Sequence, residues 1–86
     1  MTTQQWERIK IHFKAGEYNY NTDTPTVIVK QCPLFPKYVG LKCKIIGYFQ
    51  TQQYLPLLRL AVISKAGLRP LRGFATLDDI EIIIEE

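Results

Sequence analysis

The chain has 86 residues, of which 47% are hydrophobic and 22% charged, and its formal net charge at pH 7 is +3. This length and composition are typical of one globular domain with a modest core, so we treat residues 1–86 as a single domain and exclude a low-complexity chain. No apolar run approaches the roughly 20 residues of a membrane-spanning helix. The polar N-terminus lacks the layout of a secretory signal, so we expect a cytoplasmic protein without membrane contact.

The first 25 residues are predicted to add an N-terminal strand and a loop to the domain. From residue 8, the sequence RIKIHFK alternates polar or basic residues with Ile9, Ile11 and Phe13, which is the period expected of a strand with one buried face. Trp6 precedes this strand, where we expect it to close one end of the core. The following EYNYNTDTPT is rich in the Asn, Asp, Thr and Pro typical of a loop.

Two further strands are predicted between residues 26 and 50. TVIVKQC is the first, and the two prolines of CPLFPKYVG then indicate a loop. In GLKCKIIGYFQ, alternation places Leu41, Cys43 and Ile45 on one face and two lysines on the other. Gly47 is expected to form a bulge in this strand.

The remainder of the chain is predicted to add three strands. LPLLRLAVIS is the first; we expect an irregular connection at KAGLRPLRG, a short strand at FATL and a final strand at IEIII. A helical turn before the last strand could be capped by Thr76 or Asp78. Strands at such close spacing predict an all-β fold, namely a small antiparallel barrel of five or six strands.

One stretch of the chain resembles a known motif. TVIVKQCPLFPKYVGLKCKIIG, residues 26–47, combines a V-x-V strand, a loop with prolines and an aromatic residue, and Gly-Leu-Lys-x-Lys-Ile, and it resembles the KOW motif. FATLDDIEII, residues 74–83, looks like the closing part of the barrels that carry this motif. The resemblance implies a Src-homology-3-like barrel core over residues 26–84 and, by analogy with ribosomal proteins and transcription elongation factors, association with a ribosome or polymerase. Cys43 stands where those families usually have a second glycine.

The sequence contains no arrangement of residues typical of a catalytic or metal site. The single histidine, His12, lies in the alternating segment near the N-terminus, where we expect it to face solvent. Asp78 and Asp79 are adjacent in a turn rather than opposed across a cleft. Cys32 and Cys43 are too few for a structural zinc site, and we expect free thiols, although a disulfide between neighbouring strands is conceivable. We therefore expect neither an enzyme nor a bound cofactor or metal.

The distribution of charge is the strongest functional signal. Residues 24–77 include eight basic residues and no acidic one, whereas the last nine residues contain five acidic residues and no basic one. Basic side chains neutralise phosphates, and aromatic rings stack on unpaired bases. We therefore predict a binding module for nucleic acid, RNA in preference to DNA, with candidate contacts at Lys37, Tyr38, Lys42, Lys44, Tyr48, Arg69 and Arg72. In a barrel these residues could converge beside Phe49 and Tyr54.

The alternative is a protein-interaction adaptor or a small accessory subunit of a larger complex. The last two long apolar segments have more leucine and isoleucine than one face of a small barrel can bury. The candidate contact residues are Ile83, Leu57 and Arg59, and the expected partner is an acidic protein or a second copy of the chain.

Overall fold

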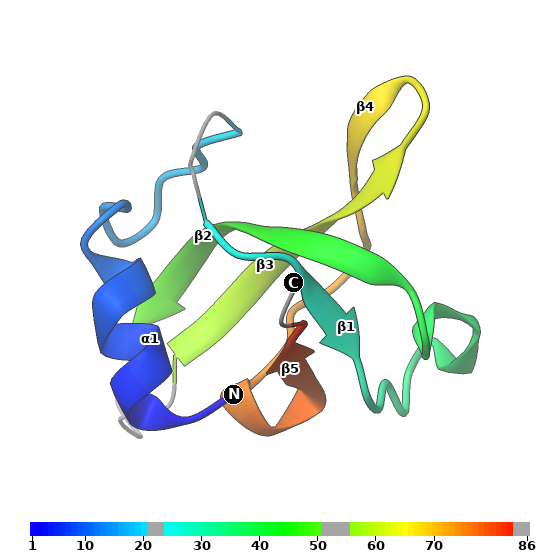
Figure 1. The fold of residues 1–86 in the computed structure, drawn as a ribbon, viewed down its shortest axis with the longest axis horizontal. Coiled ribbons are helices and arrows are strands. Elements are labelled where there is room, and N and C mark those ends of the chain that lie inside the picture. The colour runs from blue at the N-terminus through cyan, green and yellow to red at the C-terminus, as the bar shows by residue number, and fades with distance from the viewer. Residues whose placement is uncertain (21–23, 51–55, 84–86) are drawn as a thin grey trace.

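A computed structural model describes residues 1–20, 24–50 and 56–83, which form a mostly β fold with one short α-helix (Figure 1). Among these residues, no helix is both long and apolar enough to cross a membrane. The elements in chain order are α1 (Thr3–Lys10), β1 (Val27–Val29), the 3-10 turn η1 (Pro36–Tyr38), β2 (Lys42–Gln50), β3 (Pro56–Ser64), β4 (Gly67–Pro70), the 3-10 turn η2 (Leu77–Asp79) and β5 (Ile80–Ile82).

The five strands form one antiparallel sheet in the order β4-β3-β2-β1-β5. The mostly β prediction is confirmed, but the predicted closed barrel is wrong, because no pairing joins the edge strands β4 and β5 in the described part of the chain. The edge strand β5 and its neighbour β1 are short, with three residues in each strand. Figure 1 shows α1 on one side of the sheet and the β3–β4 hairpin projecting on the other.

The long β2–β3 pair forms the centre of the sheet and follows the predicted alternation. Cys43 and Ile45 are buried, whereas Lys42 is exposed. The register shifts between Ile45 and Gly47, which confirms the predicted bulge. A Cβ on Gly47 would lie 2.6 Å from the backbone oxygen of Glu17, so only glycine lets this segment cross β2 so closely.

The predicted N-terminal strand is wrong, because this segment forms α1. Thr2 and Gln5 make a capping box in which each side chain accepts a hydrogen bond from the other residue's backbone N–H. The buried residues Trp6, Ile9 and Phe13 follow helical spacing and its continuation into the next turn, whereas Ile11, expected on the same face, is 80% exposed. Trp6 is in the core, as predicted.

The C-terminal half differs from the prediction at two segments. The segment predicted to be an irregular connection contains β4, which pairs with β3 from Gly67 to Pro70. The strand predicted at residues 74–77 is reduced to a single bridge between Leu58 and Ala75. The helical turn is confirmed as η2, where Thr76 and Asp79 form a capping box.

A single cluster of buried side chains joins the helix to the sheet. Tyr48 and Trp6 meet edge to face at its centre, with ring centroids 5.1 Å apart. The cluster consists of Trp6, Ile9, Phe13, Val27, Val29, Cys43, Ile45, Tyr48, Leu58, Leu60, Leu71, Ala75 and Ile80.

Candidate functional site

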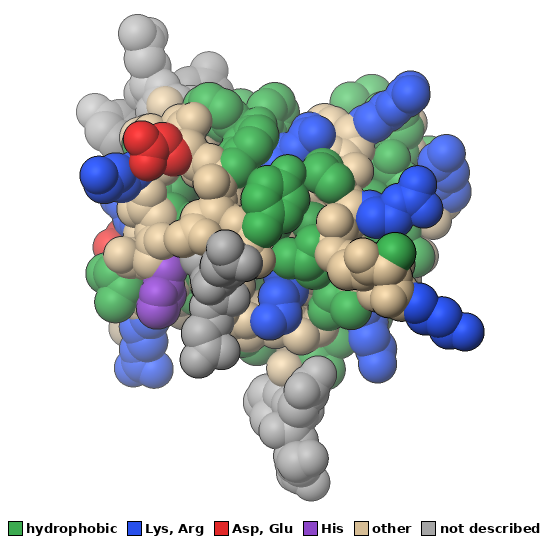
Figure 2. Space-filling view, turned by 90° about the horizontal axis from the view of Figure 1, so that it is seen from above, with side chains coloured by type: hydrophobic (Ala, Val, Ile, Leu, Met, Phe, Trp, Pro, Cys, Tyr) green, Lys and Arg blue, Asp and Glu red, His purple; other side chains and the backbone are tan. Residues whose placement is uncertain are grey.

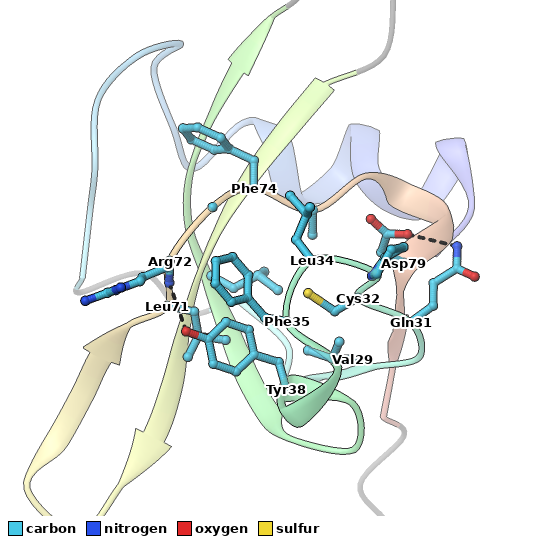
Figure 3. Close-up of a pocket in the computed structure, with 14 residues that line it drawn as sticks. Val29, Gln31, Cys32, Leu34, Phe35, Tyr38, Leu71, Arg72, Phe74 and Asp79 are labelled. Atoms are coloured by element: carbon cyan, nitrogen blue, oxygen red, sulfur yellow. Dashed lines mark hydrogen bonds between the residues drawn. The ribbon is translucent and has the colours of Figure 1, made fainter.

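A hollow of about 260 Å³ lies between the loop that follows β1 and the segment that follows β4 (Figure 3). Buried aliphatic side chains of the core form its floor, and three aromatic side chains are part of its lining. We call this hollow the aromatic groove; its lining residues are Val29, Gln31, Cys32, Pro33, Leu34, Phe35, Tyr38, Leu60, Leu71, Arg72, Gly73, Phe74, Ala75 and Asp79.

One wall of the aromatic groove is built by the Pro-rich loop. Pro36 begins the 3-10 turn η1, in which residues three apart lie nearly above one another. This geometry brings the rings of Phe35 and Tyr38 together, with centroids 5.2 Å apart and planes inclined by 31°. The loop therefore presents a preformed pair of rings, with Leu34 beside it and 83% exposed.

The opposite wall is held in place by Arg59 of β3. The Nη1 of Arg59 donates a hydrogen bond of 3.1 Å to the carbonyl oxygen of Gly73, and its guanidinium lies 5.8 Å from the centre of the Phe74 ring. The same guanidinium lies 5.9 Å from the Tyr18 ring. Phe74 also meets Phe49 edge to face, yet it remains 49% exposed. A ring fixed by its neighbours but open to solvent can contact a ligand without losing much conformational freedom.

The two ends of the aromatic groove differ in polarity. At one end, the backbone N–H of Arg72 donates to the hydroxyl of Tyr38 at 3.4 Å, and the Lys37 ammonium lies 5.7 Å from the centre of the Tyr38 ring. At the other end, Gln31 donates from Nε2 to Asp79 at 2.9 Å. The second carboxylate oxygen of Asp79 accepts from the backbone of Thr76, also at 2.9 Å. In Figure 3 the Arg72 side chain extends away from the end that holds Asp79.

The candidate nucleic-acid contacts predicted from the sequence do not form one surface. Lys37 and Arg72 are both next to Tyr38 at one end of the groove, Lys37 through its ammonium and Arg72 through its backbone N–H. Tyr48 is only 6% exposed and packs on Trp6, so its ring cannot stack on a ligand. Tyr54 lies outside the described residues.

The other three basic residues among the predicted nucleic-acid contacts lie on the sheet. Lys42 and Lys44 are on the face of β2 opposite the buried Cys43. Arg69 is exposed on the edge strand β4, in register with Val62. Figure 2 shows several basic side chains on the side where the β3–β4 hairpin projects, and others on the opposite side, where the acidic side chains visible on this face also lie.

The predicted protein-contact residues are also dispersed. Leu57 and Arg59 lie on β3, where both are partly buried. Ile83 follows β5 and is partly buried, and its backbone N–H donates to the carbonyl oxygen of Thr26 at 2.9 Å. The guanidinium of Arg59 makes contacts within the molecule rather than projecting outward.

The prediction from sequence missed Phe35 and Phe74 as site residues. Phe35 stands between two prolines in an otherwise exposed loop, and an aromatic residue in such a place was an available signal. Phe74 was assigned to a strand, and its position across the groove depends on the hydrogen bond from Arg59, which no local pattern reveals.

The other polar groups singled out in the sequence are His12, Cys32 and Cys43. In the described part of the chain, no cluster of three or more His, Cys, Asp or Glu residues could hold a metal ion, and His12 is exposed as predicted. Both thiols are free: Cys32 is half-buried at the groove, and Cys43 is buried. Burial raises the pKa of Cys43 to about 11, which opposes formation of a thiolate.

No protein-family model matches the chain, and no curated protein or solved structure matches it.

Proposed function

We propose that the chain is a non-enzymatic binding module that contacts nucleic acid, RNA in preference to DNA, through the aromatic groove and the cations beside it. The observation that carries this proposal is the position of Tyr38 in a groove that also exposes Phe74: the Lys37 ammonium lies over the Tyr38 ring, and the Arg72 backbone is bonded to the Tyr38 hydroxyl. Cations beside rings satisfy the two requirements of single-strand binding, which are phosphate neutralisation and base stacking.

We also propose that the domain is related to Src-homology-3-like barrels in its topology. The strand order, with β1 between β2 and β5, and the 3-10 turn η2 directly before the last strand support this relation. Such a scaffold does not by itself specify a ligand, so the functional proposal depends on the groove.

A salt titration tests the proposal. A fluorescent single-stranded RNA of about 12 nucleotides, a length within the usual site size, should bind at low salt. The logarithm of its affinity should fall linearly with the logarithm of salt concentration. Arg72→Gln should flatten the slope by about 0.7, the value for one phosphate contact on a single strand. Lys14→Gln removes the same charge from a residue that does not line the groove and should leave the slope unchanged. Absence of binding at low salt would refute the proposal.

The second candidate function is a protein-interaction module. The observation that favours it is Leu34, which is 83% exposed beside a groove with an aliphatic floor. Sedimentation of the pure chain at increasing concentration tests the simplest partner, a second copy. Leu34→Ser should weaken self-association, whereas Ile11→Ser, at a position 80% exposed, should not. Ile83→Lys should also weaken self-association, because Ile83 is the contact residue predicted beside β5. If the chain stays monomeric at all concentrations, the result counts against a second copy as the partner.

A further inference from the structure

We propose that the aromatic groove takes one unpaired base of a single strand, with the adjoining phosphates on Lys37 and Arg72. This inference rests on the proposed function and makes it more specific, because it predicts discrimination between single strands and duplexes. It also assigns stacking to Phe35, Tyr38 and Phe74 rather than to Tyr48.

The walls of the groove suit a flat, apolar ligand face. Gly73 separates Arg72 from Phe74, and a Cβ at Gly73 would lie 3.5 Å from the Phe35 ring. The two walls therefore approach each other closely at the glycine, beside the opening that Phe74 and the Phe35–Tyr38 pair share (Figure 3). Because every base has a π-face, rings arranged in this way bind bases with little regard to sequence.

The order of polar groups along the groove matches the order of groups in a nucleotide. Lys37 and Arg72 supply positive charge at one end, and the Tyr38 hydroxyl, which accepts from the Arg72 backbone, keeps its own proton to donate. At the other end, the Asp79 carboxylate is already bonded through both oxygens, to Gln31 and to Thr76. These bonds hold the carboxylate in place, while the Gln31 amide oxygen remains an acceptor suited to an amino group on a base edge.

A base inside a duplex cannot reach this site without being unstacked. The floor of the groove is made of core residues such as Leu60 and Leu71, which are 5% and 9% exposed, so a ligand can reach them only by entering between the walls. Unstacking a paired base costs free energy that an unpaired base does not require. We therefore expect duplexes to bind only through their phosphates.

The experiment uses the full chain and an RNA strand that contains one 2-aminopurine, whose fluorescence is quenched on stacking. Binding of the single strand should quench this signal, and the matched duplex should bind about tenfold more weakly at the same salt concentration. Phe74→Ala should abolish the quenching and weaken single-strand binding by about tenfold, the order expected for loss of one stacked base. Val39→Ala is the matched control, because Val39 is also 49% exposed but does not line the groove.

The outcomes separate this inference from the proposed function. Equal binding of single strand and duplex, without quenching, would overturn the base pocket but would leave phosphate binding intact. A lack of binding by any oligonucleotide would overturn both. A free mononucleotide that binds as tightly as the strand would show that a nucleotide, and not a polymer, is the occupant. If Phe74→Ala unfolds the chain, Phe35→Leu with the same quenching readout replaces it.

Discussion

Arg59 shows how a charged residue within an apolar strand can serve the structure of a site without touching a ligand. Its guanidinium lies between the rings of Tyr18 and Phe74 and is hydrogen-bonded to the carbonyl oxygen of Gly73. These contacts attach the segment after β4 to β3, so Arg59 positions one wall of the aromatic groove. Its Nε is buried without a partner among the described residues, which offsets part of this stabilisation.

Arg59→Met should lower the free energy of unfolding by about 1–2 kcal/mol, because it removes one hydrogen bond from a charged donor and two cation–π contacts. Chemical denaturation followed by tryptophan fluorescence measures this change. Arg69→Met, on the exposed edge strand, should change stability by less than about 0.5 kcal/mol. Equal effects of the two substitutions would contradict the positioning role of Arg59.

The two cysteines should differ sharply in reactivity. Burial raises the pKa of Cys43 from 9.0 to about 11, so its thiol stays protonated at pH 8, whereas Cys32 is half-buried at the groove. A disulfide reagent at pH 8 should therefore modify one thiol per chain quickly and the second only on unfolding. Cys32→Ser should remove the fast phase. Two fast-reacting thiols in the folded chain would refute this assignment.

The same pKa shift gives the pH dependence of stability a definite sign. Because the folded state holds the Cys43 proton more tightly than the unfolded chain does, its contribution to stability is complete below pH 9 and is lost as the pH rises from 9 to 11. Cys43→Ala should remove this part of the alkaline loss, which denaturation curves across that pH range can measure.

At the scale of the elements, α1 shows why an alternating pattern can mislead. The run from Arg8 to Phe13 alternates, but Trp6, Ile9 and Phe13 also fit helical spacing, and this spacing determines the burial. The capping signal of Thr2 and Gln5 just before the segment was the feature that favoured a helix. When a short segment is compatible with both periods, such local signals and packing determine whether it forms a helix or a strand.

Other elements could be predicted because their signals are local. Two prolines indicated the loop before β2, Gly47 indicated the bulge, and Thr76 indicated the cap of η2. β4 was missed because Gly67 and Pro70 are poor strand residues. As an edge strand, β4 tolerates a proline that has no N–H to donate.

Removal of the Trp6 side chain tests how strongly α1 depends on its contact with the sheet. Trp6 is 3% exposed and meets Tyr48 edge to face, so Trp6→Ala should lower the free energy of unfolding by about 3–5 kcal/mol. Circular dichroism must follow the transition, because the variant has no tryptophan. Ile11, the C-cap residue of α1, is 80% exposed, so Ile11→Ala should have little effect. A loss below about 1 kcal/mol for Trp6→Ala would mean that α1 contributes little to the core.

At the scale of the whole molecule, the candidate site was predictable only where its residues are close in sequence. Lys37 and Tyr38 are neighbours in one turn, and their pairing follows from the loop. Arg72 reaches Tyr38 only because the β3–β4 hairpin returns the chain to the loop after β1. Tyr48 was wrongly placed on the surface because nothing in its own strand shows that α1 covers it.

The basic side chains around the β3–β4 hairpin should act on a polyanion through their summed field rather than through contact with the groove. Lys65 and Arg69 are exposed on this hairpin and do not line the groove. Opposite charges raise association rates by steering, whereas contacts in a fitted site mainly set dissociation rates. The double variant Lys65→Glu with Arg69→Glu should therefore slow association with single-stranded RNA several-fold at low salt and leave dissociation nearly unchanged.

Phe74→Ala should show the opposite pattern, with faster dissociation and nearly unchanged association, because it removes a stacking contact but no charge. Stopped-flow measurements at several salt concentrations separate the two rates. The association rates of the double variant and the parent chain should converge as salt approaches about 1 M, where the Debye length falls to roughly 3 Å and screening removes the field. A double variant that slowed association equally at all salt concentrations would instead indicate a direct contact of the hairpin with RNA, and the groove would then be only part of the binding surface.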